Sequence, residues 1–451
     1  MVLIKEKPDR KQENKNVNIA IVGSGYVGLV TGVCLAEIGH KVICVDNDRE
    51  KIASLKKLKM PIFEPGLEEL LKRNVERKRL SFNSSIAEAA KRSTVIFIAV
   101  GTPSKENGDA DLTYVENVAR EIARSMDSYK LVVEKSTVPA ATGKRIERTI
   151  RLNMPKKNIY GFDVASNPEF LREGSAVHDF MNPDRIVIGV ESQRAESILR
   201  DIYKPLKSAH VIVTDINSAE MIKHASNSFL ATKISFINAV GQICDRVGAD
   251  VLKVAEGMGY DKRIGREFLN AGIGFGGSCF PKDVDAFIRL SEKSGYDFTI
   301  LKAVREVNAE QKRSFLKLIE DKLWILKGKT IGVLGLAFKP ETDDMRNASS
   351  VEIIEVLQAE GAKIKAYDPQ AVEKAKEVLK GVSFCKDVYK TADGCDCLLL
   401  LTEWSEFKRI DYGKLKRAVK QPVIFDGRNF LNKEAAQKAG FEYFGVGRGG
   451  V

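Results

Sequence analysis

A glycine-rich turn between two apolar runs constrains the fold of this chain more than any other feature. The apolar run 17–22 leads into Gly23-Ser24-Gly25-Tyr26-Val27-Gly28, followed by a helical pattern and a second apolar run, 41–46. This order predicts a strand, a helix and a second strand. Gly23 permits the tight turn, Gly25 lets a phosphate approach the backbone, and Gly28 allows close helix packing. The chain therefore opens with a predicted Rossmann-like dinucleotide-binding unit.

The second run ends in Asp46, at the position from which an acid accepts hydrogen bonds from the ribose hydroxyls. A carboxylate there repels the extra phosphate of NADP, which predicts NAD as the cofactor. Arg49 and Lys51 follow closely and leave the acceptance of NADP open. The other residues of the predicted cofactor site are Tyr26, Val27, Lys51, Thr102 and Thr137, the last two in loops after further predicted strands.

The chain divides into three segments after a charged stretch, residues 1–16, that we expect to be a frayed basic tail. Residues 17–214 form the predicted NAD-binding domain. Residues 215–326 open with a long helical pattern and form a central helical, dimerising domain that carries Cys279. Residues 327–451 alternate strand and helix patterns again. The expected fold is α/β, with two Rossmann-like, doubly wound parallel-sheet domains joined by a long central helix in an all-helical middle region.

Composition narrows the class of protein further. A chain of 451 residues, 44% hydrophobic, can bury two or three cores, and neither terminus carries the ~20 apolar residues of a membrane helix. The net charge of +11 fits nucleic acid or pyrophosphate-bearing ligands. Because Lys and Arg are spread along the chain, we expect the protein to bind a small molecule and to bind neither nucleic acid nor a membrane. Seven cysteines without a signal-like start predict reduced thiols and a cytoplasmic protein.

No metal site is expected. Cys395 and Cys397 lead into the apolar run 398–401 and have no second pair of ligands nearby, which favours a buried strand. The four histidines show no ligand spacing.

Cys279 has surroundings unlike those of the other six cysteines. It lies in the run Gly274-Phe275-Gly276-Gly277-Ser278-Cys279-Phe280-Pro281-Lys282-Asp283. The glycines would let a ligand approach the backbone, and Pro281 suits the first turn of a helix. A thiol at a helix N-terminus is biased towards the thiolate, so this setting favours a nucleophile over the ordinary buried cysteine.

This run, together with residues 166–174 and Pro183-Asp184-Arg185, resembles the UDP-glucose 6-dehydrogenase family over roughly residues 17–430. The resemblance implies an N-terminal NAD domain, a central helix with the dimer contact and a C-terminal UDP domain. It also implies an NAD-dependent, four-electron oxidation of UDP-glucose to UDP-glucuronate, in which Cys279 forms first a thiohemiacetal and then a thioester.

The same resemblance assigns catalytic roles residue by residue. Lys223 and Asn227, one helical turn apart, would stabilise an oxyanion, and Asp283 would orient or activate water. Glu173 would assist proton transfer through a water, close to Thr137. Taken alone, Lys223 is typical of a solvated helix lysine, Asp283 of a partner for the helix dipole, and Glu173 of an ordinary polar stretch.

The implied substrate contacts are Glu169, Phe170, Leu171, Glu173, Lys223, Asn227, Arg263, Phe275, Gly276, Phe338, Lys339 and Arg428. Arg263 would reach the substrate of a neighbouring subunit, which makes a homodimer, or a higher homo-oligomer, the smallest active unit. Without the resemblance Arg263 would be an ordinary surface arginine. The sequence leaves two roles open for Arg346: a contact with the substrate, or a structural ion pair with Asp343 or Asp344.

Two alternatives to this function stand beside it. The same chemistry could act on GDP-mannose or UDP-N-acetylmannosamine, because GDP-mannose dehydrogenases share the Gly-Gly-Ser-Cys string. The acetylamino-sugar enzymes tend to carry histidine before the cysteine, where this chain has Ser278. A non-catalytic NAD-binding regulator would need the glycines and Asp46, but not Cys279 together with Lys223.

Overall fold

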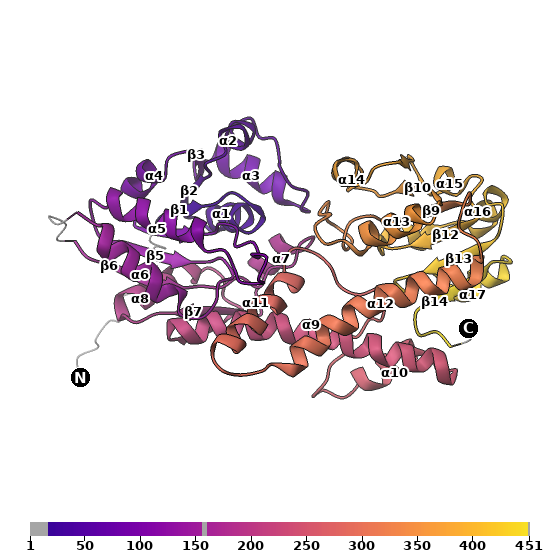
Figure 1. Cartoon of the computed structure of the whole chain (residues 1–451). Coiled ribbons are helices and arrows are strands. Elements are labelled where there is room, and N and C mark those ends of the chain that lie inside the picture. The colour runs from indigo at the N-terminus through magenta and orange to yellow at the C-terminus, as the bar shows by residue number, and fades with distance from the viewer. Residues whose placement is uncertain (1–16, 156–159, 450–451) are drawn as a thin grey trace, which may run out of the picture.

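The computed structural model of the chain describes residues 17–155 and 160–449; the predicted tail 1–16 lies outside them. Two α/β bodies form the ends of the molecule, and long helices connect them (Figure 1). The expected α/β architecture, with two Rossmann-like sheets and a helical middle region, is confirmed.

The first sheet has eight strands in the order β3-β2-β1-β4-β5-β6-β7-β8. They are β1 (Asn18–Val22), β2 (Lys41–Val45), β3 (Leu80–Asn83), β4 (Val95–Ile98), β5 (Lys130–Glu134), β6 (Phe162–Ser166), β7 (Arg185–Gly189) and β8 (His210–Thr214). Neighbouring strands are parallel, except that β6 and β7 meet in antiparallel orientation at Ser166 and Gly189. The expected parallel order thus extends from β3 to β6, while β7 and β8 run in the opposite direction.

Alternation along the strands explains why helices cover both faces of this sheet. In β1, Ile19 and Ile21 belong to one core, and Ala20 and Val22 belong to the core on the opposite face. The first core is completed by α1 (Tyr26–Glu37), α2 (Arg49–Lys56), α3 (Leu67–Glu76), α7 (Ala176–Met181) and α8 (Gln193–Tyr203). The second is completed by α4 (Ile86–Arg92), α5 (Thr113–Ser125) and α6 (Thr142–Asn153).

The second sheet has six parallel strands in the order β11-β10-β9-β12-β13-β14. They are β9 (Thr330–Leu334), β10 (Lys363–Tyr367), β11 (Val382–Phe384), β12 (Cys397–Leu400), β13 (Val423–Asp426) and β14 (Glu442–Gly445). The accompanying helices are α13 (Ser349–Ala359), α14 (Val372–Val378), α15 (Val388–Ala392), the 3-10 helix η1 (Ser405–Arg409), α16 (Tyr412–Ala418) and α17 (Lys433–Lys438). Cys397 is buried at the start of β12, as expected, whereas Cys395 is buried just before this strand.

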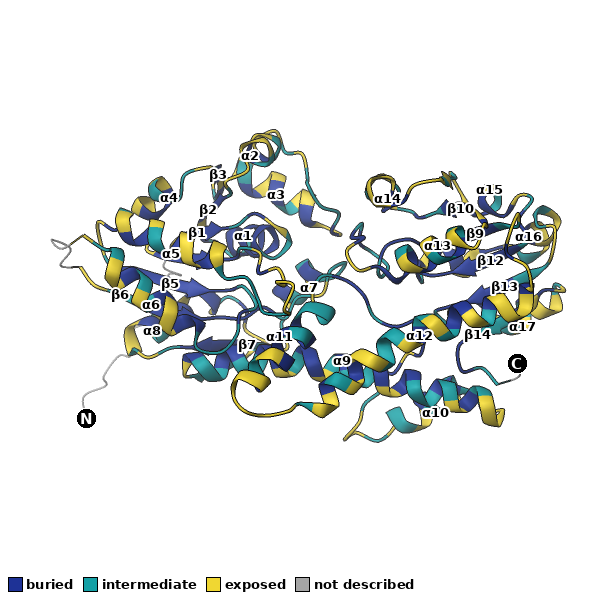
Figure 2. Cartoon of the chain, in the orientation of Figure 1, coloured by how far each residue is buried: buried dark blue, intermediate teal, exposed yellow. Residues whose placement is uncertain are grey.

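The predicted long central helix is α9 (Ile216–Val247), of 32 residues. The Asp215 carboxylate caps its first turn by accepting from the Ser218 N–H at 2.9 Å, and Gly248, with φ of +75°, ends it. The other central helices are α10 (Val251–Gly259), α11 (Phe280–Lys293) and α12 (Thr299–Leu323). One core joins residues of α9, α10 and α12 to the second sheet, so these three helices pack against the C-terminal domain (Figure 2).

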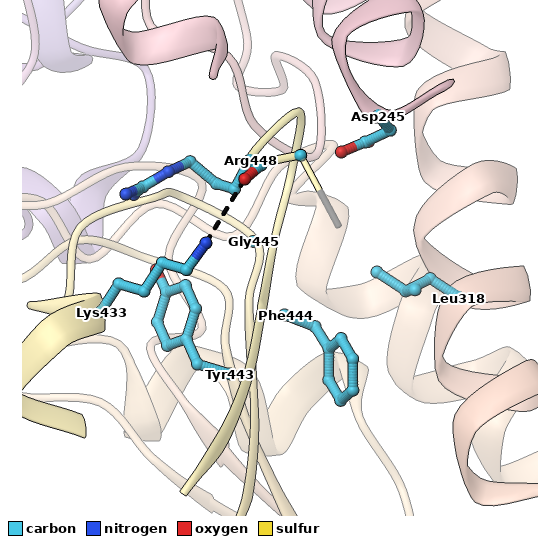
Figure 3. Close-up of a pocket in the computed structure, with 8 residues that line it drawn as sticks. Asp245, Leu318, Lys433, Tyr443, Phe444, Gly445 and Arg448 are labelled. Carbon is cyan, nitrogen blue, oxygen red and sulfur yellow. Dashed lines mark hydrogen bonds between the residues drawn. The ribbon is translucent and has the colours of Figure 1, made fainter. Parts of the chain in front are cut away.

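Beyond β14 the chain turns back onto the central helices. The Gly447 N–H donates to Asp245 Oδ2 of α9 at 3.0 Å, and the Gly447 carbonyl accepts from the Val251 N–H at 2.7 Å. Figure 3 shows Lys433 reaching the Arg448 carbonyl, a contact of 3.4 Å, next to Tyr443. These bonds tie the last described residues to the junction of α9 and α10.

No helix in the described part of the chain is both long and apolar enough to cross a membrane. Within residues 17–155 and 160–449, no group of three His, Cys, Asp or Glu side chains is arranged to hold a metal ion.

The contact between the residues after β14 and the central helices predicts that a substitution at Gly447 changes the stability of the protein. Its φ is +68°, and a Cβ there would lie 2.7 Å from the Gly241 Cα. We expect Gly447→Ala to displace the residues after β14 and to destabilise the protein by about 2 kcal/mol, lowering the urea midpoint of unfolding. The control is Gly257→Ala in α10, where a Cβ meets nothing within 4 Å; it should be neutral or slightly stabilising. A Gly447→Ala midpoint equal to that of the parent protein would contradict the proposed packing.

Candidate active site

The predicted glycine turn connects β1 to α1. Gly23 has φ of +103°, and a Cβ on it would lie 2.4 Å from the Ala99 carbonyl oxygen. A Cβ on Gly28 would lie 1.8 Å from the Gly23 carbonyl oxygen, so side chains are excluded at both positions. Gly25 differs: it is the N-cap of α1, and a Cβ there would meet nothing within 4 Å. An open helix N-terminus fits the pyrophosphate of a dinucleotide.

Asp46 lies directly after β2 and is held beside this turn. Its Oδ2 accepts from the Ser24 N–H at 2.9 Å and from Lys51 Nζ at 3.0 Å. The carboxylate thus stands at the edge of the predicted cofactor site with its cationic neighbour Lys51. Tyr26 and Val27 form the first turn of α1.

The loops after β4 and β5 meet each other and the start of α11. Thr102 Oγ1 donates to the Thr137 carbonyl at 2.9 Å. Lys282 Nζ contacts Thr102 Oγ1 at 3.4 Å and donates to Asp283 Oδ1 at 2.7 Å. The predicted cofactor residues Thr102 and Thr137 are therefore linked to the start of α11.

One face of α9 carries Lys223 and Asn227, as the spacing predicts. Lys223 Nζ lies 2.9 Å from Glu169 Oε1, with both side chains almost fully buried. Asn227 Nδ2 donates to Asp283 Oδ2 at 2.6 Å. The structure thus brings together four predicted site residues from three separate parts of the chain.

These contacts determine the charges of the cluster. Desolvation acts to lower the pKa of Lys223, but Glu169 and Asp283 outweigh it, so the pKa is raised and Lys223 is a cation. Desolvation acts to raise the pKa of Asp283, but Lys282 and Lys223 outweigh it, so the pKa is lowered and Asp283 is a carboxylate.

Cys279 is the N-cap of α11 and is exposed. Even so, desolvation by the protein atoms close to the thiol, followed by the charges of Glu169 and Asp283, raises its pKa to about 11. Lys223 and the Ser278 hydroxyl act in the opposite direction but are outweighed. The expected bias towards thiolate at a helix N-terminus is therefore wrong, and Cys279 is a thiol at neutral pH.

Glu173 lies where the first and last segments meet. Its Oε1 is 3.4 Å from Ser278 Oγ and 3.6 Å from Arg346 Nη2, and its Oε2 is 3.4 Å from Thr342 Oγ1. Desolvation and the neighbouring Asp344 carboxylate raise the pKa of Glu173 to about 7, against the lowering effect of Arg346. Glu173 is thus poised to exchange a proton near neutral pH.

The two open interpretations of Arg346 separate in the structure. Its guanidinium donates to Asp344 Oδ1 and Oδ2 at 2.9 Å through Nε, and to Oδ2 at 2.6 Å through Nη2. The structural ion pair is therefore present, with Asp344 rather than Asp343, which instead pairs with Lys374.

The glycine run before Cys279 packs against the C-terminal domain. A Cβ on Gly276 would lie 2.1 Å from the Asn347 carbonyl oxygen, and one on Gly277 would lie 2.6 Å from the Phe338 ring. Arg428 Nη1 donates to the Gly274 carbonyl at 2.9 Å. On this side the glycines make room for protein, not for a ligand as the sequence suggested; a substrate contact at Gly276 stays a prediction.

The remaining predicted substrate residues are spread around this junction. The Phe170 ring lies under the Arg185 guanidinium, 3.8 Å from the ring centre, and the Leu171 N–H donates to Glu169 Oε2 at 2.6 Å. The Phe275 N–H donates to the Asn308 side chain at 2.8 Å.

Two predicted substrate residues are cations. Desolvation lowers the pKa of Lys339, against the raising effect of the Glu173 charge. Arg263 is 89% exposed and pairs with Asp261. The substrate roles of these residues stay predictions.

Glu64 is a buried site residue that the sequence did not reveal. Its Oε2 accepts from the Tyr26 hydroxyl and from the Gly174 N–H, the latter at 2.7 Å. Its Oε1 accepts from the Ala176 N–H at 2.7 Å. Glu64 thus connects the cofactor turn to the segment that carries Glu173. Its only sequence signal is a Glu-Pro-Gly string, which is typical of an ordinary surface turn.

Glu220 and His224, also on α9, were missed as well. Glu220 Oε1 accepts from the Gly143 N–H at 2.8 Å, and His224 Nε2 donates to the Val138 carbonyl at 2.8 Å. The chain that follows Thr137 is therefore bound at two points to the helix that carries Lys223.

A dinucleotide-binding domain and a second Rossmann-like domain that meet beside one polar cluster define an oxidoreductase with two nucleotide-bearing ligands. Residues 17–207 match the NAD binding domain of the UDP-glucose/GDP-mannose dehydrogenase family, residues 217–310 its central domain, and residues 332–433 its UDP binding domain. The chain belongs to this family of NAD-dependent dehydrogenases, which confirms the resemblance and the cofactor.

Its relatives cover almost the whole chain. It is 50% identical over 434 residues to the UDP-glucose 6-dehydrogenase TuaD of Bacillus subtilis, spanning 96% of this chain and 94% of the relative. It is 44% identical over 438 residues to the UDP-glucose 6-dehydrogenase of Rhizobium meliloti, spanning 96% of this chain and 100% of the relative. The solved UDP-glucose dehydrogenase of Pyrobaculum islandicum matches with a TM-score of 0.91 at 42% identity, covering 97% of this chain and 99% of that one.

The open space at Gly25 yields a prediction that separates cofactor binding from folding. Gly25 has an ordinary φ of −74°, so Gly25→Val should leave the urea midpoint nearly unchanged. The added side chain would occupy the space of the pyrophosphate, so we expect NAD to bind at least about tenfold more weakly, or about 1.4 kcal/mol. Calorimetric titration with NAD measures this, with Gly257→Ala as the control. Unchanged NAD affinity would contradict the assignment of the turn.

Proposed function

We propose that this chain oxidises C6 of UDP-glucose to the carboxylate, giving UDP-glucuronate and reducing two NAD per sugar. The observation that carries this proposal is the exposed Cys279 thiol next to the buried Lys223–Glu169 and Asn227–Asp283 pairs. The UDP binding domain match at residues 332–433, and relatives with this activity in their names, support the substrate.

In the first half of the reaction the sugar alcohol becomes an aldehyde. When bound, NAD accepts a hydride from C6 in each of the two oxidations. A water bonded to Glu173 takes the proton of the C6 hydroxyl towards solvent. The Lys223 ammonium and the Asn227 amide polarise the carbonyl oxygen that forms.

In the second half the aldehyde is oxidised while attached to the protein. Cys279 Sγ attacks C6, and the oxyanion of the resulting thiohemiacetal is stabilised by Lys223 and Asn227. Loss of the second hydride leaves a thioester. A water oriented by Asp283 attacks the thioester carbon, and the C–S bond breaks to release the uronate and restore Cys279.

Two observations favour UDP-glucose over the other nucleotide sugars. Ser278 precedes Cys279, where the acetylamino-sugar enzymes tend to carry histidine. The solved GDP-mannose dehydrogenase of Pseudomonas aeruginosa is 32% identical to this chain, against 42% for the Pyrobaculum enzyme and 50% for TuaD. GDP-mannose and UDP-N-acetylmannosamine remain the substrates to test next.

We also propose that the active unit is a homodimer formed along α9. Phe229, Phe236, Ile243 and Val247 are between 52% and 69% exposed. At about 100° per residue they form one apolar stripe, on the side of α9 away from Lys223 and Asn227. An apolar stripe of this kind is typical of a protein–protein contact. A homodimer is also what the proposed role of Arg263 at a neighbouring subunit's substrate requires.

We place the protein in the cytoplasm. All seven cysteines are free, and five of them are buried, which suits a reducing compartment.

The stoichiometry of the reaction tests the proposed function directly. With excess NAD, the protein should release two NADH per UDP-glucose. Cys279→Ser should lower steady-state NADH formation at least about a hundredfold, because an alcohol is a far weaker nucleophile than a thiol. Absorbance at the NADH band measures both. One NADH per sugar, or full activity of Cys279→Ser, would remove the covalent role; activity only with another nucleotide sugar would change the substrate.

The dimer has its own test. Phe236→Glu places a charge in the middle of the α9 stripe and should shift the molar mass in light scattering from dimer to monomer, with loss of most activity. The control is Leu152→Glu on α6, since Leu152 is 73% exposed but lies outside the stripe. A parent protein that is already monomeric and active would contradict the proposal.

A further inference from the structure

The Ser278 hydroxyl lies between two groups that exchange protons. Its Oγ is 3.6 Å from Cys279 Sγ and 3.4 Å from Glu173 Oε1. Ser278 and Cys279 are adjacent in the turn before α11, whereas Glu173 belongs to the segment after β6. A hydroxyl can accept one hydrogen bond while donating another, so this position connects thiol to carboxylate.

The mechanism needs such a connection, because Cys279 is a thiol and must give up its proton as it attacks. The nearby charged groups are poor acceptors. Lys223 is already a cation, and both oxygens of Asp283 are held, by Asn227 at 2.6 Å and by Lys282 at 2.7 Å.

Both carboxylate oxygens of Glu169 also have close partners. Its Oε1 is 2.9 Å from Lys223 Nζ, and its Oε2 accepts from the Leu171 N–H at 2.6 Å. Glu173, by contrast, lies 3.4 to 3.6 Å from the side chains of Ser278, Thr342 and Arg346, and desolvation and the Asp344 carboxylate raise its pKa to about 7. Among Glu169, Glu173 and Asp283, Glu173 is the one best placed to accept a proton through Ser278.

We propose that Ser278 is a catalytic residue that carries the thiol proton of Cys279 to Glu173. This role rests on the proposed function. As Sγ forms its bond to the aldehyde carbon, the S–H bond breaks and its proton moves to Ser278 Oγ. The original hydroxyl proton moves to Glu173 Oε1, and the C=O electron pair becomes the oxyanion beside Lys223. When water later cleaves the thioester, the proton returns from Glu173 through Ser278 to the departing sulfur.

The relay predicts a change in the pH dependence of aldehyde oxidation. The charged groups that act on Glu173 are Asp344, Arg346 and Lys339; those that act on Cys279 are Glu169, Asp283, Lys223 and Arg346. In the parent protein the rate should rise as Glu173 loses its proton near pH 7 and then level off. In Ser278→Ala, where the thiol must ionise directly, it should keep rising about tenfold per pH unit towards the thiol pKa of about 11.

The first experiment supplies the UDP-linked C6 aldehyde together with NAD and follows NADH in a stopped-flow instrument from pH 6 to 10. At pH 7 we expect Ser278→Ala to slow this step at least about tenfold, while the first oxidation of UDP-glucose continues and hydroxylamine traps the aldehyde. Ser278→Thr retains a hydroxyl and should restore the rate. The matched control is Thr342→Val, which removes a hydroxyl at 3.4 Å from the other oxygen of Glu173, away from the thiol. A Ser278→Ala protein with the parent rate and pH profile would overturn the relay.

The second experiment needs no substrate, so it separates failure of the relay from failure of the proposed function. Alkylation of Cys279 by iodoacetamide at pH 9 is followed by mass spectrometry of its peptide. The Ser278 hydroxyl stabilises the thiolate, so Ser278→Ala should alkylate about tenfold more slowly, and Thr342→Val at the parent rate. Equal rates in all three proteins would overturn the contact between Ser278 and the thiol, even if UDP-glucose proved to be the wrong substrate.

Discussion

The buried polar face of α9 is the constraint on which the rest of the structure depends. Glu220, Lys223, His224 and Asn227 are each at most 7% exposed, although all four side chains are polar or charged. A buried charge is costly unless it is paired, and removal of one partner destabilises by about 3–5 kcal/mol. Their partners are residues 143, 169, 138 and 283, which lie on three segments outside α9. The helix can therefore dock in only one register, and that register assembles the site.

A second constraint is the close contact between the glycine run and the C-terminal domain. Gly276 and Gly277 touch Asn347 and Phe338 at distances that exclude any side chain, and Arg428 is bonded to the backbone of Gly274. Three of the central helices, α9, α10 and α12, also share one core with the second sheet. Because packed interfaces do not deform gradually, Cys279 is held in a fixed position relative to the second sheet, and the first domain meets this assembly along α9 and at Glu173.

Sequence patterns predicted what depends on neighbours along the chain. The turn at Gly23–Gly28, the acid at Asp46 and the extent of α9 follow from local geometry, and the structure has them where they were expected. The reversed direction of β7 and β8 was not predictable, because the apolar pattern of a buried strand does not depend on the direction in which the strand runs. Glu64 was missed because its partners lie far along the chain. The glycines before Cys279 were expected to make room for a ligand, because the protein residues that they contact belong to another domain.

The direction of the pKa shift at Cys279 was missed for the same reason, and it has a chemical consequence. A helix N-terminus is a local feature, whereas the desolvation and the carboxylates of Glu169 and Asp283 that oppose it arise from the tertiary fold. A thiolate of high pKa is more nucleophilic than one of low pKa, but it is also a poorer leaving group. Attack on the aldehyde thus gains from the raised pKa, while cleavage of the thioester suffers unless the sulfur is protonated as it departs. A site that raises the pKa of its nucleophile therefore needs a proton acceptor and donor within reach of the same sulfur.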